Sequence, residues 1–151
     1  MDKNLLHSMI REFLREDVGR GDLTSESIFS DHEIGSARFV ARDSFIVAGV
    51  ESVAAEVFKV QNPSIITVDA VPDGTWARPK MGLLTVSGPV IDLLKAERVA
   101  LNLLQRLSGI ATFTAQFVEK VKVYAVRITD TRKTTPGLRI PSGGKVGPAN
   151  D

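Results

Sequence analysis

The chain has 151 residues, of which 43% are hydrophobic, enough to bury the core of one domain, with or without a further fragment. Nineteen basic and eighteen acidic residues give a net charge of +1, so no overall field favours nucleic acid or an anionic membrane as a partner. The absence of cysteine excludes disulfides and thiolate metal sites, and no apolar run approaches the roughly 18 residues of a transmembrane helix. We therefore expect a soluble, cytoplasmic protein.

The first 90 residues mix helical and strand-like patterns. Apolar side chains recur at helical spacing over residues 3–16, and the glycines of Gly19-Arg20-Gly21 end that helix with a turn. Further along, a helix is expected to begin after Gly49, and Pro72-Asp73-Gly74 is a turn signal. Short apolar or alternating runs predict strands at 36–41, 45–48, 66–70 and 83–86. This half of the chain is therefore expected to form an α+β layer of short strands with covering helices.

Polar side chains in the first glycine-rich loop raise the question of a metal or phosphate site. Asp17, Asp22 and Thr24 fit neither the P-loop nor the EF-hand spacing, so helix capping by Asp22 or Thr24 is the expected role. His7 and His32 have no second imidazole or cysteine at ligand spacing, and we assign no role to either.

From Asp92 to about Lys122 the pattern is helical, with a broad apolar stripe over 93–107. Ser108-Gly109 is expected to break this helix, so that residues 110–121 form a second one. The run Val123–Ile128 then reads as a buried strand, and a helix pair followed by a strand is typical of the start of an α/β unit. Residues 140–151, with three glycines and two prolines, are expected to form a disordered tail.

Cations gather directly after that expected strand. Residues 130–139 contain Arg132, Lys133 and Arg139, with Thr131 beside them. Arginine offers a planar fork that matches carboxylate or phosphate, and ligands of α/β proteins bind at the carboxyl ends of strands. The segment therefore predicts a site for a small polyanion. A solvated basic loop around Pro136-Gly137 is the alternative.

Arg98 lies on the apolar helix, where an unpaired cation is not expected to be fully buried. Glu97 is adjacent in sequence and points elsewhere on the helix, so it is a poor partner. Arg98 is either a rim residue with its head in water, or an arginine offered to a ligand or a neighbouring subunit.

A different alternative concerns Lys80, which lies between two turns much as the modified lysine of biotinyl or lipoyl carrier domains does.

Three segments, 16–24, 96–112 and 130–139, carry a resemblance to the quinolinate phosphoribosyltransferase family, in which they occur in the same order. The resemblance implies an N-terminal α/β sandwich domain over 1–107 and the beginning of a catalytic α/β barrel over 108–139, followed by the tail at 140–151. It also implies a homodimer or larger homo-oligomer. The implied reaction converts quinolinate and phosphoribosyl pyrophosphate, with Mg²⁺, to nicotinate mononucleotide, pyrophosphate and carbon dioxide, a step of NAD biosynthesis.

Residue roles follow from the same resemblance. Arg132 and Lys133 would hold quinolinate carboxylates with Thr131 beside them, Arg98 would reach the neighbouring subunit's active site, and Arg139 would contact a ligand. The family continues with a His-Arg motif, a lysine-bearing strand and acidic residues near the metal, which this sequence lacks. We therefore expect an N-terminal fragment without Mg²⁺ ligands and with little activity. The alternatives are a phosphoribosyltransferase-like paralogue associated with molybdenum transport and a non-catalytic dimerisation module.

Overall fold

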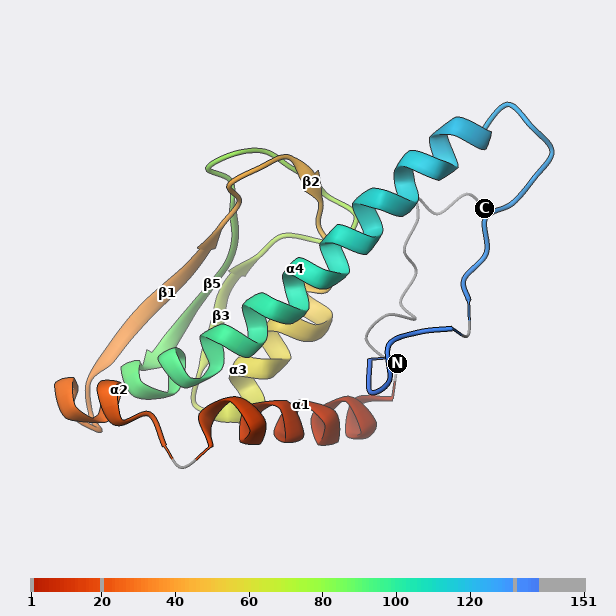
Figure 1. Cartoon of the computed structure of the whole chain (residues 1–151). Coiled ribbons are helices and arrows are strands. Elements are labelled where there is room, and N and C mark those ends of the chain that lie inside the picture. The colour runs from red at the N-terminus through yellow and green to blue at the C-terminus, as the bar shows by residue number, and fades with distance from the viewer. Residues whose placement is uncertain (1, 20, 132, 139–151) are drawn as a thin grey trace.

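The computed structural model describes residues 2–19, 21–131 and 133–138, and shows a layer of helices on one face of a small antiparallel sheet (Figure 1). In chain order its elements are α1 (Lys3–Val18), α2 (Leu23–Ile28), β1 (Ile34–Val40), β2 (Phe45–Ile46), η1 (Val50–Ala54), α3 (Ala55–Gln61), β3 (Ile66–Ala70), β4 (Trp76–Ala77), β5 (Gly82–Pro89) and α4 (Val90–Val121). The expected mixture of helix and sheet is confirmed. Within the described residues, no helix is both long and apolar enough to cross a membrane.

The main sheet has the order β1-β5-β3, with both neighbouring pairs antiparallel, and β2 pairs with β4 in a separate two-stranded sheet. All four predicted strands of the first 90 residues are therefore present, and β4 is an additional one. Alternation predicted β3 without showing which face is buried. Its Ile66 and Val68 side chains are 61% and 60% exposed, so the outer face of this edge strand is not covered by the described residues.

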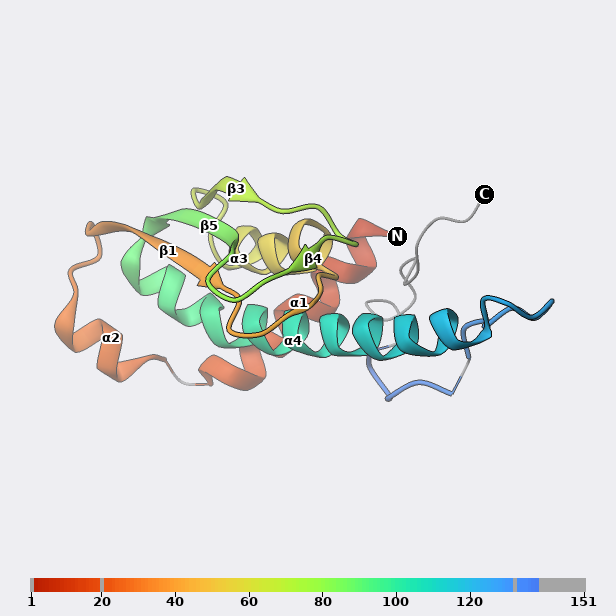
Figure 2. The same cartoon turned by 90° about the horizontal axis from the view of Figure 1, so that it is seen from above.

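The core lies between the sheet and the helices. Helices α3 and α4 pack on the sheet, and α1 packs against both of them from outside, as the two views in Figures 1 and 2 show. Phe39 of β1 and Phe58 of α3 are buried with their ring centroids 5.7 Å apart. The predicted helix after Gly49 is confirmed, although its first turn, η1, is wound as a π-helix.

Helix α4 is continuous from Val90 to Val121, so the predicted break at Ser108-Gly109 is wrong. One glycine costs a helix only about 1 kcal/mol, and side-chain contacts hold this part of the helix in place. The Ser108 hydroxyl accepts a hydrogen bond from the Ala48 backbone N–H at 3.1 Å, and Thr112 accepts one from Ile46 at 2.9 Å. The last turns of α4 project beyond the sheet (Figure 2).

The predicted strand over Val123–Ile128 is also wrong. These residues leave the end of α4 without regular structure, and their apolar side chains are exposed, Val123 at 84% and Tyr124 at 67%. A strand needs neighbouring backbone to satisfy its N–H and C=O groups, and no described strand reaches this segment. The expected tail at 140–151 lies outside the described residues.

Candidate functional site

The end of α1 and the short helix α2 meet the first half of α4 along a charged edge. The Nε atom of Arg98 lies 3.3 Å from Oδ2 of Asp17, and Nζ of Lys95 lies 2.7 Å from Oε1 of Glu26. Lys95 and Arg98 are three residues apart and therefore share one face of α4. The fold thus brings the segment at 16–24 against the segment at 96–112.

Asp22 caps α2, as one of the two capping possibilities predicted. Its carboxylate accepts hydrogen bonds from the Ser25 hydroxyl at 2.5 Å and from the Ser25 backbone N–H at 3.1 Å. These bonds, assisted by the charges of Arg98 and Lys95, lower the pKa of Asp22. The hydrogen bond and the charge of Lys95 likewise lower the pKa of Glu26. The carboxylates of Asp22 and Glu26 are therefore both engaged in contacts that favour their ionised form.

Arg98 lies at the rim of the apolar stripe with its side chain 71% exposed, whereas the side chain of Asp17 is 21% exposed. The Oδ2 atom of Asp17 is buried and receives no hydrogen bond from the described residues, so the nearby guanidinium supplies its electrostatic compensation. Asp17 is a partner that the sequence did not reveal, because its place in the glycine-rich loop pointed only to a metal or phosphate site.

Glu97 lies on another side of α4, as predicted from its position next to Arg98. It lines a hollow of about 620 Å³ between β1, the loop after β1 and α4, together with Arg38, Arg42 and Asp43. Both signs of charge line this hollow, which does not favour a polyanion there.

A smaller pocket, of about 360 Å³, lies next to Asp17, between α1, α4 and the segment before residue 139. All three of the sequence segments that carry the resemblance contribute to it. Its lining residues are Phe13, Glu16, Asp17, Val99, Asn102, Leu103 and Leu138. Apolar groups and carboxylates line this pocket, without a cation among the described residues. Arg98, the ion-pair partner of Asp17, is not among the lining residues.

The segment at 130–138 is attached to the rest of the fold by contacts outside its predicted cation cluster. Arg106 of α4 donates a hydrogen bond to the Thr135 hydroxyl, and Leu138 packs against the core. Arg106 was not among the predicted site residues. Its place inside the segment at 96–112 was the only signal that could have pointed to it.

No contact between the described residues brings the predicted cations together. Thr131 and Lys133 are exposed, and the Lys133 backbone N–H donates to the Thr131 hydroxyl at 3.1 Å. Arg132 and Arg139 lie outside the described residues. Within the described residues, no hydrogen bond or ion pair joins Arg98 to Thr131 or Lys133.

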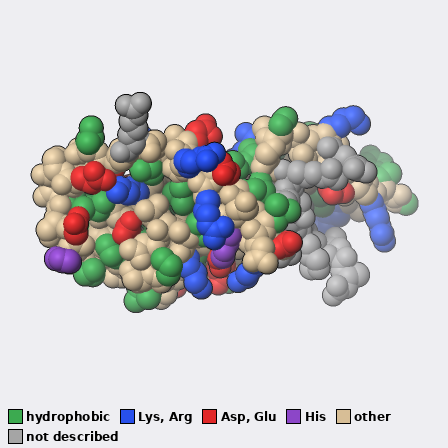
Figure 3. Space-filling model, turned by 90° about the horizontal axis from the view of Figure 1, so that it is seen from below, with side chains coloured by type: hydrophobic (Ala, Val, Ile, Leu, Met, Phe, Trp, Pro, Cys, Tyr) green, Lys and Arg blue, Asp and Glu red, His purple; other side chains and the backbone are tan. Residues whose placement is uncertain are grey.

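The described residues form no group of three or more His, Cys, Asp or Glu side chains that could hold a metal ion. Basic and acidic side chains are also interspersed on the face seen in Figure 3. Lys80 takes a left-handed conformation, with φ of 71°, and its backbone N–H donates to the Ala41 carbonyl, a turn role that gives the carrier alternative no support.

Comparison with known proteins supports the family resemblance that the three segments carry. Residues 22–108 match the family model described as quinolinate phosphoribosyl transferase, N-terminal domain, and residues 110–143 match the model of its C-terminal domain. A probable nicotinate-nucleotide pyrophosphorylase (carboxylating) of Synechocystis is 39% identical over 136 residues, which are 90% of this chain and 45% of that protein. The protein of the same name in Bacillus subtilis is 40% identical over 135 residues, 89% of this chain and 46% of that protein.

Solved structures give the same result. The crystal structure of NadC from Streptococcus pyogenes has a TM-score of 0.87 and 33% identity, covering 93% of this chain and 50% of that one. The nicotinate-nucleotide pyrophosphorylase of Francisella tularensis has a TM-score of 0.84 and 30% identity, covering 94% and 50%. The chain thus spans about half the length of these relatives. The molybdenum-associated alternative receives no support from them.

Proposed function

The chain belongs to the quinolinate phosphoribosyltransferase family, and we propose that it serves the reaction of that family, the transfer of a phosphoribosyl group to quinolinate with loss of carbon dioxide. Its described residues would supply the substrate-binding edge built from α1, the α1–α2 loop and α4. The observation that carries this proposal is Arg98, an exposed guanidinium paired with Asp17 at the meeting of two of the three diagnostic segments.

Arg98 is proposed to bind a carboxylate of quinolinate. Quinolinate is a dianion, and the guanidinium fork matches a carboxylate with two parallel hydrogen bonds. Because Arg98 points into solvent, we propose that it acts in the active site of a neighbouring subunit, within a homodimer or larger homo-oligomer. The roles proposed for Thr131, Arg132, Lys133 and Arg139 rest on their positions in the segment at 130–139, not on a described contact with Arg98.

The chemistry needs orientation and charge more than an acid–base residue. The ribosyl carbon develops positive charge while pyrophosphate leaves, so fixed cations around the acceptor carboxylates and the leaving group stabilise the arrangement. Phosphoribosyl pyrophosphate is expected to bring Mg²⁺ with it, and no step of this proposal is assigned to a metal site in the described residues. The cysteine-free composition fits a reducing compartment, and the cytoplasm is part of the proposal.

A titration with quinolinate, combined with a measurement of mass in solution, tests this function. The wild-type chain is expected to form a homo-oligomer that binds quinolinate, and Arg98→Ala is expected to weaken binding by about tenfold to a hundredfold, because a charge-assisted hydrogen bond contributes roughly 1.5–3 kcal/mol. A homo-oligomer that ignores quinolinate would contradict the proposal and favour a non-catalytic dimerisation module.

A further inference from the structure

We propose that Asp17 is a positioning residue for Arg98, holding the guanidinium by its Nε side so that the terminal nitrogens face a substrate carboxylate. This inference rests on the proposed function and adds a residue to it. Asp17 touches no substrate in this arrangement and acts only through Arg98.

In this pair the carboxylate of Asp17 is largely buried and the guanidinium of Arg98 is exposed. Oδ2 of Asp17 lies 3.3 Å from Nε of Arg98, and the carboxylate belongs to the mostly buried side chain of the two. Asp17 also lines the 360 Å³ pocket, together with the apolar Phe13 and Val99 and the polar Glu16 and Asn102. The Asp17 side chain is only 21% exposed, so its carboxylate is held in one place and restrains the exposed arginine beside it.

The backbone around Asp17 is also fixed. Asp17 is the penultimate residue of α1, which ends at Val18. Gly19 closes the helix with φ of 55°, and its N–H donates to the Arg15 carbonyl at 3.1 Å. The carboxylate therefore stands on the last turn of a well-defined helix rather than on the loop that follows.

The other carboxylates of the edge are occupied. Asp22 accepts two hydrogen bonds from Ser25, and Glu26 pairs with Lys95 at 2.7 Å. Among the described residues, Asp17 is thus the one carboxylate in ion-pair contact with Arg98. A guanidinium has five N–H donors, and Asp17 approaches it from the Nε side as an ion pair. Its two terminal nitrogens are the groups that form a two-pronged contact with a carboxylate.

Nuclear magnetic resonance of the full 151-residue chain tests the pair directly. The Nε–Hε signal of Arg98, assigned by its loss in Arg98→Ala, is expected to be resolved from those of free arginines and to move to their position in Asp17→Asn. Asp17→Glu, which keeps the charge, is expected to retain most of the shift. Glu26→Gln is the matched control, since it removes one charge from the same edge but leaves the Asp17–Arg98 contact in place.

A quinolinate titration of the same variants tests the positioning role. Asp17→Asn is expected to raise the Kd for quinolinate by about tenfold, with Asp17→Glu recovering at least half of that loss and Glu26→Gln staying within twofold of wild type. An Arg98 signal that does not respond to Asp17→Asn overturns the proposal. So does an unchanged Kd in Asp17→Asn when Arg98→Ala weakens binding as expected, because the pair would then only join α1 to α4.

The two levels of the inference fail in different ways. A wild-type chain that ignores quinolinate, while its Arg98 signal still depends on Asp17, contradicts the proposed function and the substrate part of this proposal, yet leaves the pair established. Loss of the dependence, with normal quinolinate binding, contradicts the role of Asp17 alone.

Discussion

The hydroxyl of Ser108, in the middle of α4, accepts a hydrogen bond from the backbone N–H of Ala48 at 3.1 Å. Sixty residues separate the two in sequence. Ser108 is only 3% exposed. Its hydroxyl therefore replaces water as the partner of the Ala48 N–H, which lies just after the short strand β2. A small polar side chain on a buried helix face is here a structural device.

Replacing this hydroxyl is expected to destabilise the protein. Ser108→Ala leaves the Ala48 N–H without its partner in a part-buried contact, which costs about 1–3 kcal/mol. The free energy of unfolding, measured in urea, is expected to fall by that amount with an unchanged slope, because the surface exposed on unfolding stays the same.

The neighbouring residue gives a control of opposite sign. A Cβ added at Gly109 would meet nothing within 4 Å, so Gly109→Ala is expected to stabilise α4 by roughly 0.5–1 kcal/mol through a less flexible unfolded chain. If Gly109→Ala destabilised as much as Ser108→Ala, the whole segment would be sensitive to any change and the hydrogen bond would not be the cause.

These two residues also show where sequence reasoning stops. Local patterns predicted α1, the strands β1, β2, β3 and β5, and both parts of α4, because they depend on the local alternation of apolar and polar side chains. The small residues Ser108-Gly109 predicted a break in the helix. The hydrogen bond that Ser108 accepts comes from Ala48, far away in the sequence, so a local pattern could not reveal it. Val123–Ile128 has the composition of a strand, but a strand forms only where a neighbouring strand is available.

The candidate site was predictable in part for the same reason. The resemblance identified the segment that contains Arg98, and local reasoning correctly rejected Glu97 as its partner. Asp17 could not be found that way, since the contact depends on how α1 packs against α4. The linear sequence does not show that two such residues are neighbours, because they meet only where the two helices cross.

Gly49 is expected to be the glycine least tolerant of a side chain. Its φ is 86°, a conformation that costs an alanine about 1–2 kcal/mol, and a Cβ there would lie 2.5 Å from Cδ1 of Leu107. Gly49→Ala is therefore expected to lose both this strain energy and packing against α4, roughly 3 kcal/mol in total. Thermal unfolding followed by circular dichroism measures the loss.

A change at Gly74 distinguishes the cost of backbone strain from the cost of the clash with Leu107. Its φ is 88°, close to that of Gly49, but a Cβ there would meet nothing within 4 Å. Gly74→Ala is expected to cost only the backbone strain, about 1–2 kcal/mol. Equal losses at the two positions would show that the approach of Leu107 to Gly49 adds nothing.

The end of α4 carries an exposed aromatic pair. Phe113 and Phe117 are 62% and 48% exposed, with ring centroids 5.0 Å apart in an edge-on arrangement. The double change to serine is expected to reduce the fluorescence of a bound apolar dye severalfold and to alter the free energy of unfolding by no more than about 1 kcal/mol.

A second pair of exposed apolar residues serves as the control for that measurement. Leu23 and Ile28 of α2 are 79% and 67% exposed but form no aromatic pair. Their double change to serine is expected to reduce dye fluorescence much less. An equal reduction would mean that exposed apolar area alone, rather than the paired rings of α4, binds the dye.

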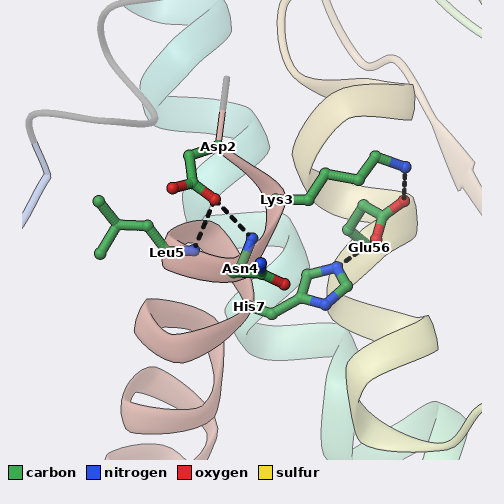
Figure 4. A network of polar contacts seen from close by, with 6 residues as sticks. All are labelled: Asp2, Lys3, Asn4, Leu5, His7 and Glu56. Atoms are coloured by element: carbon green, nitrogen blue, oxygen red, sulfur yellow. Dashed lines mark hydrogen bonds and ion pairs between the residues drawn. The ribbon is translucent and has the colours of Figure 1, made fainter.

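His7 and Lys3 of α1 both point toward Glu56 of α3, as Figure 4 shows. Nε2 of His7 lies 2.6 Å from one carboxylate oxygen of Glu56, and Nζ of Lys3 lies 3.6 Å from the other. Burial acts to raise the pKa of Glu56, but the hydrogen bond with His7 and the nearby positive charges outweigh it, so the pKa is lowered. The ionised carboxylate therefore helps to hold α1 against α3.

The sign of this shift fixes the pH dependence. Because the folded-state pKa of Glu56 lies below its ordinary value of 4.5, the stabilisation is fully present above pH 4.5 and is lost as the pH falls through the lower folded value. Glu56→Gln is expected to be less stable at pH 7, by roughly 1 kcal/mol, and to lose less stability on acidification than wild type. Urea unfolding at pH 7, 4.5 and 3 measures both effects. Glu119→Gln, which removes an exposed partner of Lys122, should show the same dependence of unfolding free energy on pH as wild type. If Glu56→Gln lost as much stability on acidification as wild type, other carboxylates would carry the pH dependence.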